Sequence, residues 1–355
     1  MTEMVYGSNP ARVSEPVLPR WWRTIDKWVL ASVFILFGFG LLLGLAASVP
    51  LASRNGLEPF YYVQRQAVFG GIALAVMIAI SMMPPDMVRR LGVMGFVLAM
   101  AALMLLPLFG TDFGRGAVRW FSFGFASIQP SEFLKPGFVI VVAWLVAASQ
   151  ELTGPPGKTL SFLLTMVVVG FLAMQPDFGQ AALVLFAWGV VYFVGGAPML
   201  LIGAVAGLVA AGGLAFYEKS EHFARRIDGF LSPEVDPRTQ LGYAANAIQE
   251  GGFFGVGVGE GQVKWSRPDA HTDFIIAVAA GEYGLILVLF ILALYGVIVV
   301  RSLARLLPER DPFARLAGAG LACIFGVQAM INMGVAVRLL PAKGMTLPFV
   351  SYGGS

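Results

Sequence analysis

Charged residues are scarce in this sequence: Asp, Glu, Lys and Arg make up 13% of the 355 residues, while hydrophobic residues make up 57%. An ordinary soluble domain carries about 25% charged residues, so soluble globular classes are excluded. The mean hydropathy of +0.77 agrees with this exclusion. A transmembrane barrel is also excluded, because its polar lumen residues would lower the apolar content. The sequence therefore predicts an all-α fold, a polytopic transmembrane helical bundle.

Cysteine is nearly absent as well. Cys323 is the one cysteine of the chain, so no intrachain disulfide can form and packing must order the loops. The net charge of +3 is small and no basic stretch is interleaved with aromatic residues, so no nucleic acid is expected as a partner. The basic start at 20–23 leads into a long apolar run, which is not typical of a cleavable signal peptide. Membrane lipids are the expected surroundings.

The apolar residues fall in blocks of about 16 to 25, the length a helix needs to cross a hydrocarbon core of roughly 30 Å. One cytoplasmic tail, 1–27, and one membrane domain, 28–355, are expected, with a long outer loop at 217–272. Nine spans are predicted, at 28–50, 66–83, 92–109, 133–149, 159–174, 180–196, 198–216, 273–300 and 314–333.

Basic residues near the first spans predict the orientation, because Lys and Arg in short loops favour the cytoplasm. The N-terminal tail and the loop with Arg89 and Arg90 are therefore placed inside. The segments 110–132, 217–272 and 334–355 then face outward, and 13 of the 24 Lys and Arg residues fall on the outer side. This excess favours an outer face that handles an anion. The alternative, that a long loop is translocated regardless of its charge, stays open.

An acidic residue stands at the outer mouth of a predicted span. Asp273 ends the segment His271-Thr272-Asp273, and an apolar run follows it. Partial burial at such a place makes an aspartate a stronger base near neutral pH. The alternative is an ordinary helix N-cap, which would place Thr272 or Asp273 identically. From position alone, the cap is favoured over catalysis.

A second polar segment, Gln129-Pro130-Ser131-Glu132 with Lys135, opens the fourth span at the same face. Glu132 and Lys135 are three residues apart, so a helix puts both on one face. There they either pair with each other or present an anion and a cation to a ligand. Pro130 with Ser131 beside it is also an ordinary helix start. Charge that enters the membrane is costly and usually faces a partner or a cavity.

Two further carboxylates lie within or between apolar runs. Glu282 is nine residues beyond Asp273, roughly 13 Å deeper at helical rise and near the midplane. A carboxylate there marks a functional site, or is protonated and hydrogen-bonded to a neighbouring helix. Asp177 lies in the break at 175–179 and is either another site carboxylate or a turn residue, the turn being the more ordinary explanation.

Glycine is dense at 251–259, but this stretch follows no strand of a βαβ unit and is not a nucleotide-binding fingerprint. We expect it to let the outer loop fold tightly against the membrane. The last residues, with Ser351 and Tyr352, offer hydroxyl groups and close backbone approach.

Five ordered segments of the chain are taken together: Gly116-Ala117-Val118-Arg119-Trp120, Gln129-Pro130-Ser131-Glu132 with Lys135, Gln175-Pro176-Asp177-Phe178-Gly179, His271-Thr272-Asp273-Phe274, and Leu347-Pro348-Phe349-Val350-Ser351-Tyr352-Gly353-Gly354-Ser355. Together these segments resemble the SEDS family of bacterial envelope proteins, the FtsW and RodA group. The segment around Lys343, Leu340-Pro341-Ala342-Lys343-Gly344, is more similar to the division-specific FtsW branch. The resemblance implies a family fold of ten spans, of which nine are predicted here.

The resemblance implies a peptidoglycan glycosyltransferase that polymerises lipid II into a growing glycan chain. It would act on the outer face of the bacterial cytoplasmic (inner) membrane, at the division septum, with a class B penicillin-binding protein transpeptidase and other division proteins as partners. The alternatives are a transporter that flips lipid-linked precursor and a non-catalytic scaffold for the penicillin-binding protein.

By the same resemblance, Asp273 is the essential catalytic aspartate. One base suffices, because the leaving lipid pyrophosphate is stable as an anion, whereas glycoside hydrolysis needs a second carboxyl group to protonate its leaving group. Arg119, Lys135 and Lys343 are expected to neutralise the pyrophosphate, and a divalent cation, Mg or Mn, stays open. The other predicted substrate-binding residues are Trp120, Gln129, Ser131, Glu132, Asp177, His271, Thr272, Glu282, Ser351 and Tyr352.

One departure concerns Glu282. The family usually has two adjacent acidic residues where this chain has Gly281-Glu282, so a role shared by such a pair stays open here.

Overall fold

The protein is helical throughout the part of the chain that its computed structural model describes, which is residues 16–111, 118–124, 127–219, 240–257, 274–337, 339–340 and 345–352 with the single positions 224, 228 and 230. The helices are α1 (Val17–Thr24), α2 (Lys27–Arg54), α3 (Tyr61–Ser81), α4 (Pro85–Phe109), α5 (Pro130–Ala148), α6 (Gly157–Met174), α7 (Phe178–Val194), α8 (Met199–Lys219), α10 (Gln240–Gly251), α12 (Ile275–Leu306) and α13 (Pro312–Ala336).

Each of the nine predicted spans coincides with one of these helices, so the predicted all-α membrane bundle is confirmed. Within the described residues, seven helices are long and apolar enough to cross a membrane, while α7 and α8 hold shorter apolar stretches, so the count of nine spans stays a prediction. Two predicted starts were too late, because α3 begins at Tyr61 and α4 at Pro85. Polar first turns extend both helices beyond their apolar runs.

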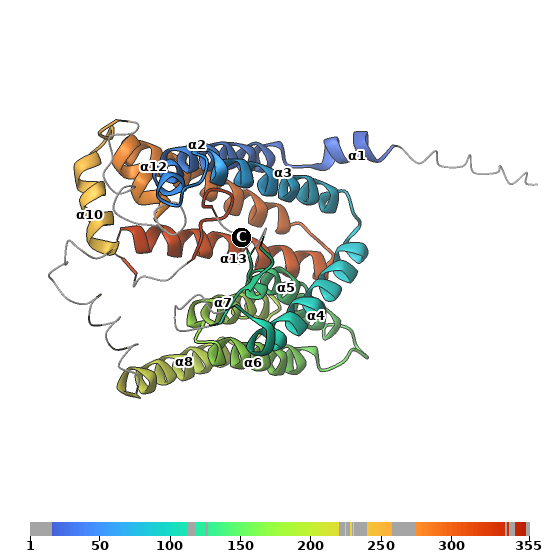
Figure 1. The fold of residues 1–355 in the computed structure, drawn as a ribbon. Helices are drawn as coiled ribbons and strands as arrows, with labels where there is room; N and C mark the ends of the chain where they lie inside the picture. Colours follow the sequence, from blue (N-terminus) through green and yellow to red (C-terminus); the bar gives the residue numbers. More distant parts are fainter. Residues whose placement is uncertain are drawn as a thin grey trace, which may run out of the picture.

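The helices form two groups with α13 between them (Figure 1). One group contains α2, α3, α10 and α12, and the other contains α4 to α8. α13 packs against α12 on one side and against α5 and α7 on the other. Each group has its own hydrophobic core: Phe138 and Trp188 are fully buried in one, and Leu36 and Ile291 in the other.

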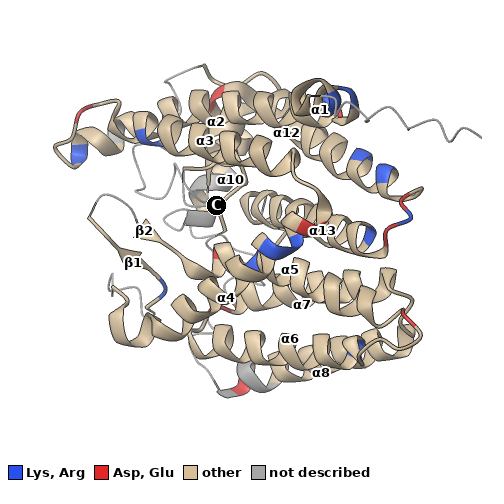
Figure 2. Cartoon of the chain, turned by 90° about the vertical axis from the view of Figure 1, so that its right-hand side faces the viewer, with Lys and Arg blue, Asp and Glu red and all other residues tan. Residues whose placement is uncertain are grey.

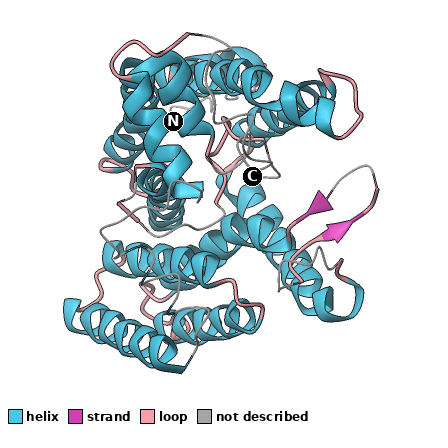
Figure 3. Cartoon of the chain, turned by 60° about the vertical axis from the view of Figure 1, so that its left-hand side comes forward, coloured by secondary structure: helices cyan, strands magenta, loops and turns pink. Residues whose placement is uncertain are grey.

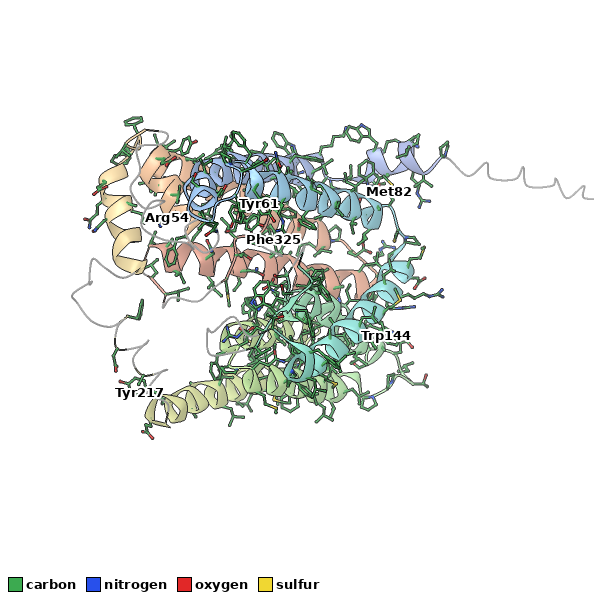
Figure 4. All side chains as sticks on the ribbon, viewed as in Figure 1. Arg54, Tyr61, Met82, Trp144, Tyr217 and Phe325 are labelled. Atoms are coloured by element: carbon green, nitrogen blue, oxygen red, sulfur yellow. The ribbon has the colours of Figure 1, made fainter. Side chains whose placement is uncertain are left out.

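Consecutive long helices run in opposite directions. Arg54, at the end of α2, and Tyr217, near the end of α8, lie toward one end of the bundle, while Met82 and Trp144 lie toward the other (Figure 4). The end with Arg54 corresponds to the predicted outer face. A hairpin of two short strands projects from the helices there (Figure 3). Its strands β1 (Phe121–Ser122) and β2 (Ser127–Ile128) pair antiparallel.

The opposite end carries an ion cluster built on Asp26. Its carboxylate caps α2 by accepting from the backbone N–H groups of Trp28 at 2.9 Å and Val29 at 3.2 Å. The Nε atoms of Arg301 and Arg305 lie 3.0 and 2.8 Å from Asp26 Oδ2. Burial acts to raise the pKa of Asp26, but these hydrogen bonds and charges outweigh it and hold the pKa below 3.8. Lys and Arg residues gather where α12 joins α13 (Figure 2).

Candidate functional site

A buried polar network lies at the start of α5. Lys135 Nζ is 2.6 Å from Glu132 Oε2, and these side chains are 5% and 11% exposed. Lys135 Nζ also donates to Gln328 Oε1 on α13 at 2.9 Å. The other carboxylate oxygen of Glu132 accepts from the side-chain amide of Gln180 on α7. Of the two alternatives left open by the sequence, the structure shows Glu132 and Lys135 paired with each other, and the pair is tied to two other helices.

The segment before the pair starts the helix and also reaches across to α7. Pro130 is the first helical residue, where its missing N–H is not needed, as predicted. Gln129 occupies the N-cap but makes no side-chain cap. Its Nε2 instead donates to Asp177 Oδ2 at 3.2 Å. Ser131 is 3% exposed, and neither its hydroxyl nor Gln180 Oε1 has a hydrogen-bond partner among the described residues.

Asp177 is a buried residue at the break between α6 and α7, where it occupies the N-cap position of α7. Its side chain is 8% exposed and does not cap α7. Burial raises the pKa of Asp177 above its ordinary value of 3.8, and the charge of Arg119 partly offsets this. Arg119 donates from Nε to the Gln175 carbonyl at 3.2 Å and from Nη2 to the Pro176 carbonyl at 2.7 Å. The guanidinium thereby holds the break between α6 and α7 next to the buried carboxylate.

Trp120 lies at the base of the hairpin, where its carbonyl accepts from Thr111 N at 2.9 Å. Its side chain is half-buried. Among the contacts of the described residues, none joins its ring to Lys135 or Asp177, so its predicted role in binding substrate stays a prediction.

Gln328 connects the network to the buried segment 345–352. Its Nε2 donates to the Thr346 carbonyl at 3.3 Å. Asn332, one turn further along α13, donates to the Met345 carbonyl. Leu347 and Val350 are fully buried in this segment. The last described residues are thus held against α13 by two side-chain amides.

Ser351 and Tyr352 are the last two residues of the segment 345–352. Ser351 Oγ accepts from Leu347 N at 2.9 Å and closes a turn. The Tyr352 ring packs edge-on against Tyr62 at the start of α3, with the centroids 5.4 Å apart. Among the described residues, the segment held by Gln328 connects these two predicted binding residues to Lys135.

Glu282 is 2% exposed on α12, so its carboxyl group faces protein rather than lipid. It lies two residues before Gly284, which interrupts the helix with φ +79° and ψ 179°. The sequence did not predict this interruption, because the apolar run is continuous across it.

Four predicted site residues, His271, Thr272, Asp273 and Lys343, lie outside the described residues. The N-cap of α12 is Phe274, which makes no side-chain cap. The catalytic role of Asp273 and the alternative that it caps the helix both stay predictions. No three His, Cys, Asp or Glu residues cluster as metal ligands in the described part of the chain. The divalent cation stays a prediction too.

The sequence analysis did not predict that three side-chain amides belong to this polar network. They are those of Gln180, Gln328 and Asn332. Each lies within an apolar helix and is at most 6% exposed. A signal was present, because a polar side chain inside a membrane helix is costly and usually has a partner on another helix.

Comparisons with known proteins agree with this architecture. The family model for the cell cycle proteins FtsW, RodA and SpoVE matches residues 27–355. The probable peptidoglycan glycosyltransferase FtsW of Caulobacter vibrioides is 40% identical over 346 residues, which cover 97% of this chain and 88% of that protein. The protein with the same description from Bacillus subtilis is 32% identical, over 96% of this chain and 88% of its own length.

Two solved structures have the same fold. One, a chain of a peptidoglycan synthase complex solved to describe how polymerization and crosslinking are coordinated, is 28% identical with a TM-score of 0.75, over 94% of this chain and 93% of that chain. The other, the rod shape determining protein RodA of Thermus thermophilus, is 27% identical with a TM-score of 0.65, over 94% and 91%. The protein is a multi-pass membrane protein that belongs to the FtsW, RodA and SpoVE family of cell cycle proteins.

Proposed function

We propose that this protein is a peptidoglycan glycosyltransferase that polymerises lipid II into glycan strands for septal wall synthesis in cell division. The relatives described as probable peptidoglycan glycosyltransferases support this activity along nearly the whole chain. The proposed place of action is the outer face of the bacterial inner membrane, at the division septum.

The buried Glu132–Lys135 pair is the observation that carries the proposal. A charged pair at the mouth of a helix bundle pays a large desolvation cost and is weak support for stability. Gln180 and Gln328 hold it from two sides. With the buried Asp177 and the cation of Arg119 close by, the end of the bundle offers fixed charges of both signs. Such fixed charges suit a substrate with both sugar hydroxyls and a pyrophosphate.

In the proposed reaction, the carboxylate of Asp273 takes the proton of the acceptor sugar hydroxyl. The freed oxygen attacks the anomeric carbon of the donor sugar as the bond to the lipid pyrophosphate breaks. The pyrophosphate leaves as an anion and needs no acid, so one base completes the proton balance. Lys135, Arg119 and Lys343 are proposed to stabilise the growing negative charge, with Mg or Mn assisting if one is bound.

The proposed partner is a class B penicillin-binding protein that cross-links the product. Its support is the structural likeness to a chain from a complex in which polymerization and crosslinking are coordinated. Other division proteins are proposed to bring the pair to the septum.

Purified protein with labelled lipid II, with and without the partner, tests the proposed activity. We expect glycan polymer to form. A flippase would move labelled lipid between the leaflets of a vesicle without making polymer, and a scaffold would do neither, so either result would overturn the proposal.

A further inference from the structure

At the break in α12, four backbone groups are paired with a segment outside the helix. A continuous helix would pair Leu285 N–H with the Gly281 carbonyl and Ile286 N–H with the Glu282 carbonyl. Here the Gly281 carbonyl accepts from Val256 N at 2.9 Å and the Glu282 carbonyl from Gly257 N at 3.2 Å. On the other side of the break, Leu285 N donates to the Gly252 carbonyl at 3.0 Å and Ile286 N to the Phe253 carbonyl at 3.4 Å.

All four partners come from residues 251–257, which we name the glycine strap. The strap begins at Gly251, the last residue of α10, and α10 packs against α12 (Figure 1). Unpaired backbone groups are very costly where lipid excludes water, so a break in a membrane helix persists only where other groups pair with it. The strap meets this requirement for the Gly281 and Glu282 carbonyls and for the N–H groups of Leu285 and Ile286.

Three glycines make this close approach possible. A Cβ on Gly255 would lie 2.1 Å from the Glu282 carbonyl oxygen, and one on Gly284 would lie 2.3 Å from the Phe253 carbonyl oxygen. A Cβ on Gly251 would lie 2.0 Å from the Ala280 carbonyl oxygen. Gly255 and Gly284 also have φ of +82° and +79°, which side chains with L configuration rarely adopt.

We infer that the glycine strap is a positioning element: it sets the place of the first half of α12, residues 275–283, independently of the second half. That half holds the buried Glu282 and follows Asp273 in the chain by two residues. In a continuous helix, the position of residues 275–283 would be fixed by the position of the rest of α12. With the break, the position of residues 275–283 depends on α10 and the glycine strap. The inference rests on the proposed function for its catalytic consequence.

The test compares Gly255→Ala and Gly284→Ala with a matched control in the full chain. Gly281→Ala is the control, because its Cβ would make an ordinary contact with Ala247 at 3.5 Å. Amide hydrogen exchange of residues 275–283 and of residues 286–300 is measured for each variant. Turnover at saturating labelled lipid II and KM are then measured on the same preparations.

For Gly255→Ala and Gly284→Ala we expect faster exchange in residues 275–283 alone. Turnover should fall about 10- to 100-fold with KM unchanged, because small misplacements of reacting groups cost rate rather than binding. Gly281→Ala should match the unaltered chain in both measurements. Unchanged exchange, or faster exchange with full turnover, would overturn the inference.

Two further arms keep the outcomes distinct. If the unaltered chain makes no polymer, the proposed function fails, and hydrogen exchange alone then decides whether the strap holds residues 275–283. If the two alanine variants do not fold, Gly252→Ala decides instead, because its Cβ meets no atom within 4 Å and only its φ of +52° is disfavoured. We expect Gly252→Ala to shift exchange and turnover less, in the same directions, and no shift in either would overturn the inference.

Discussion

Lys135 and Gln328 are 193 residues apart in the sequence and are joined by a hydrogen bond of 2.9 Å between Nζ and Oε1. Lys135 belongs to the group of helices from α4 to α8, while Gln328 belongs to α13, which contacts both groups. Because Gln328 also holds the Thr346 carbonyl, the charged pair and the buried segment 345–352 share one side chain.

The first prediction concerns the ion pair. Lys135→Met leaves the Glu132 carboxylate buried without its cation, so the free energy of unfolding should fall by about 3 kcal/mol or more. The double variant Lys135→Met with Glu132→Gln removes both charges and should regain most of that stability. If the pair serves substrate, turnover of lipid II should stay about 100-fold low in both variants. Thermal unfolding in detergent and polymerisation assays check this; activity that returns with stability would show a structural role only.

Gln328→Leu should uncouple Lys135 from the segment 345–352. It leaves Lys135 Nζ one acceptor short and the Thr346 carbonyl without the amide of Gln328, which should cost about 1–3 kcal/mol. Met330→Leu is the matched control on the same helix. Met330 is 64% exposed, so this substitution should lower the free energy of unfolding by less than about 0.5 kcal/mol. Equal unfolding temperatures for the two variants would contradict the bridging role.

The raised pKa of Asp177 predicts that the free energy of unfolding depends on pH. Its pKa is raised above 3.8, so the folded state binds more protons than the unfolded state as the pH rises from 3.8 through the raised pKa. The free energy of unfolding falls over that window, by about 1.4 kcal/mol for each pH unit that the window spans. Asp177→Asn keeps an acceptor for Gln129 and removes the loss, so its advantage in unfolding temperature should grow with pH. Glu151→Gln, in an exposed loop, controls for the lost charge. An advantage that shrinks as the pH rises would refute the assignment.

At the other end of the bundle, Asp26→Ala removes the cap of α2 and should cost about 0.5–2 kcal/mol. Asp26→Asn keeps a capping oxygen and should cost less, because Arg301 and Arg305 are 43% and 54% exposed and such ion pairs contribute only about 0–1 kcal/mol. The pKa of Asp26 is lowered, so its stabilisation is present above 3.8 and is lost as the pH falls through the lowered value. Thermal unfolding of both variants checks the order; a larger loss in Asp26→Asn would contradict it.

Much of the fold follows from the sequence, because the length of an apolar run and its flanking polar residues decide where a membrane helix lies. The Glu132–Lys135 pair was also predictable, since helical spacing puts the two side chains on one face. The break at Gly284 was not, because a glycine in an apolar run is also tolerated in a straight helix. Its partner, the glycine strap, is set by tertiary contacts.

The site could be predicted only in part for a similar reason. Gln129 and Asp177 are 48 residues apart. No local sequence pattern predicts which side-chain amide donates a hydrogen bond to which carboxylate. Gln180 and Gln328 carried a signal in their apolar surroundings, but only packing shows that both converge on one ion pair.

The most direct test of the account is the rate of glycan polymerisation from labelled lipid II by purified Asp273→Asn protein. Glu250→Gln, which removes an exposed carboxylate of α10, serves as the control. With Asp273 as the base, polymer formation is abolished in Asp273→Asn and unchanged in Glu250→Gln, while binding of the transpeptidase partner persists in both. Polymer made by Asp273→Asn at close to the normal rate and length would contradict the account.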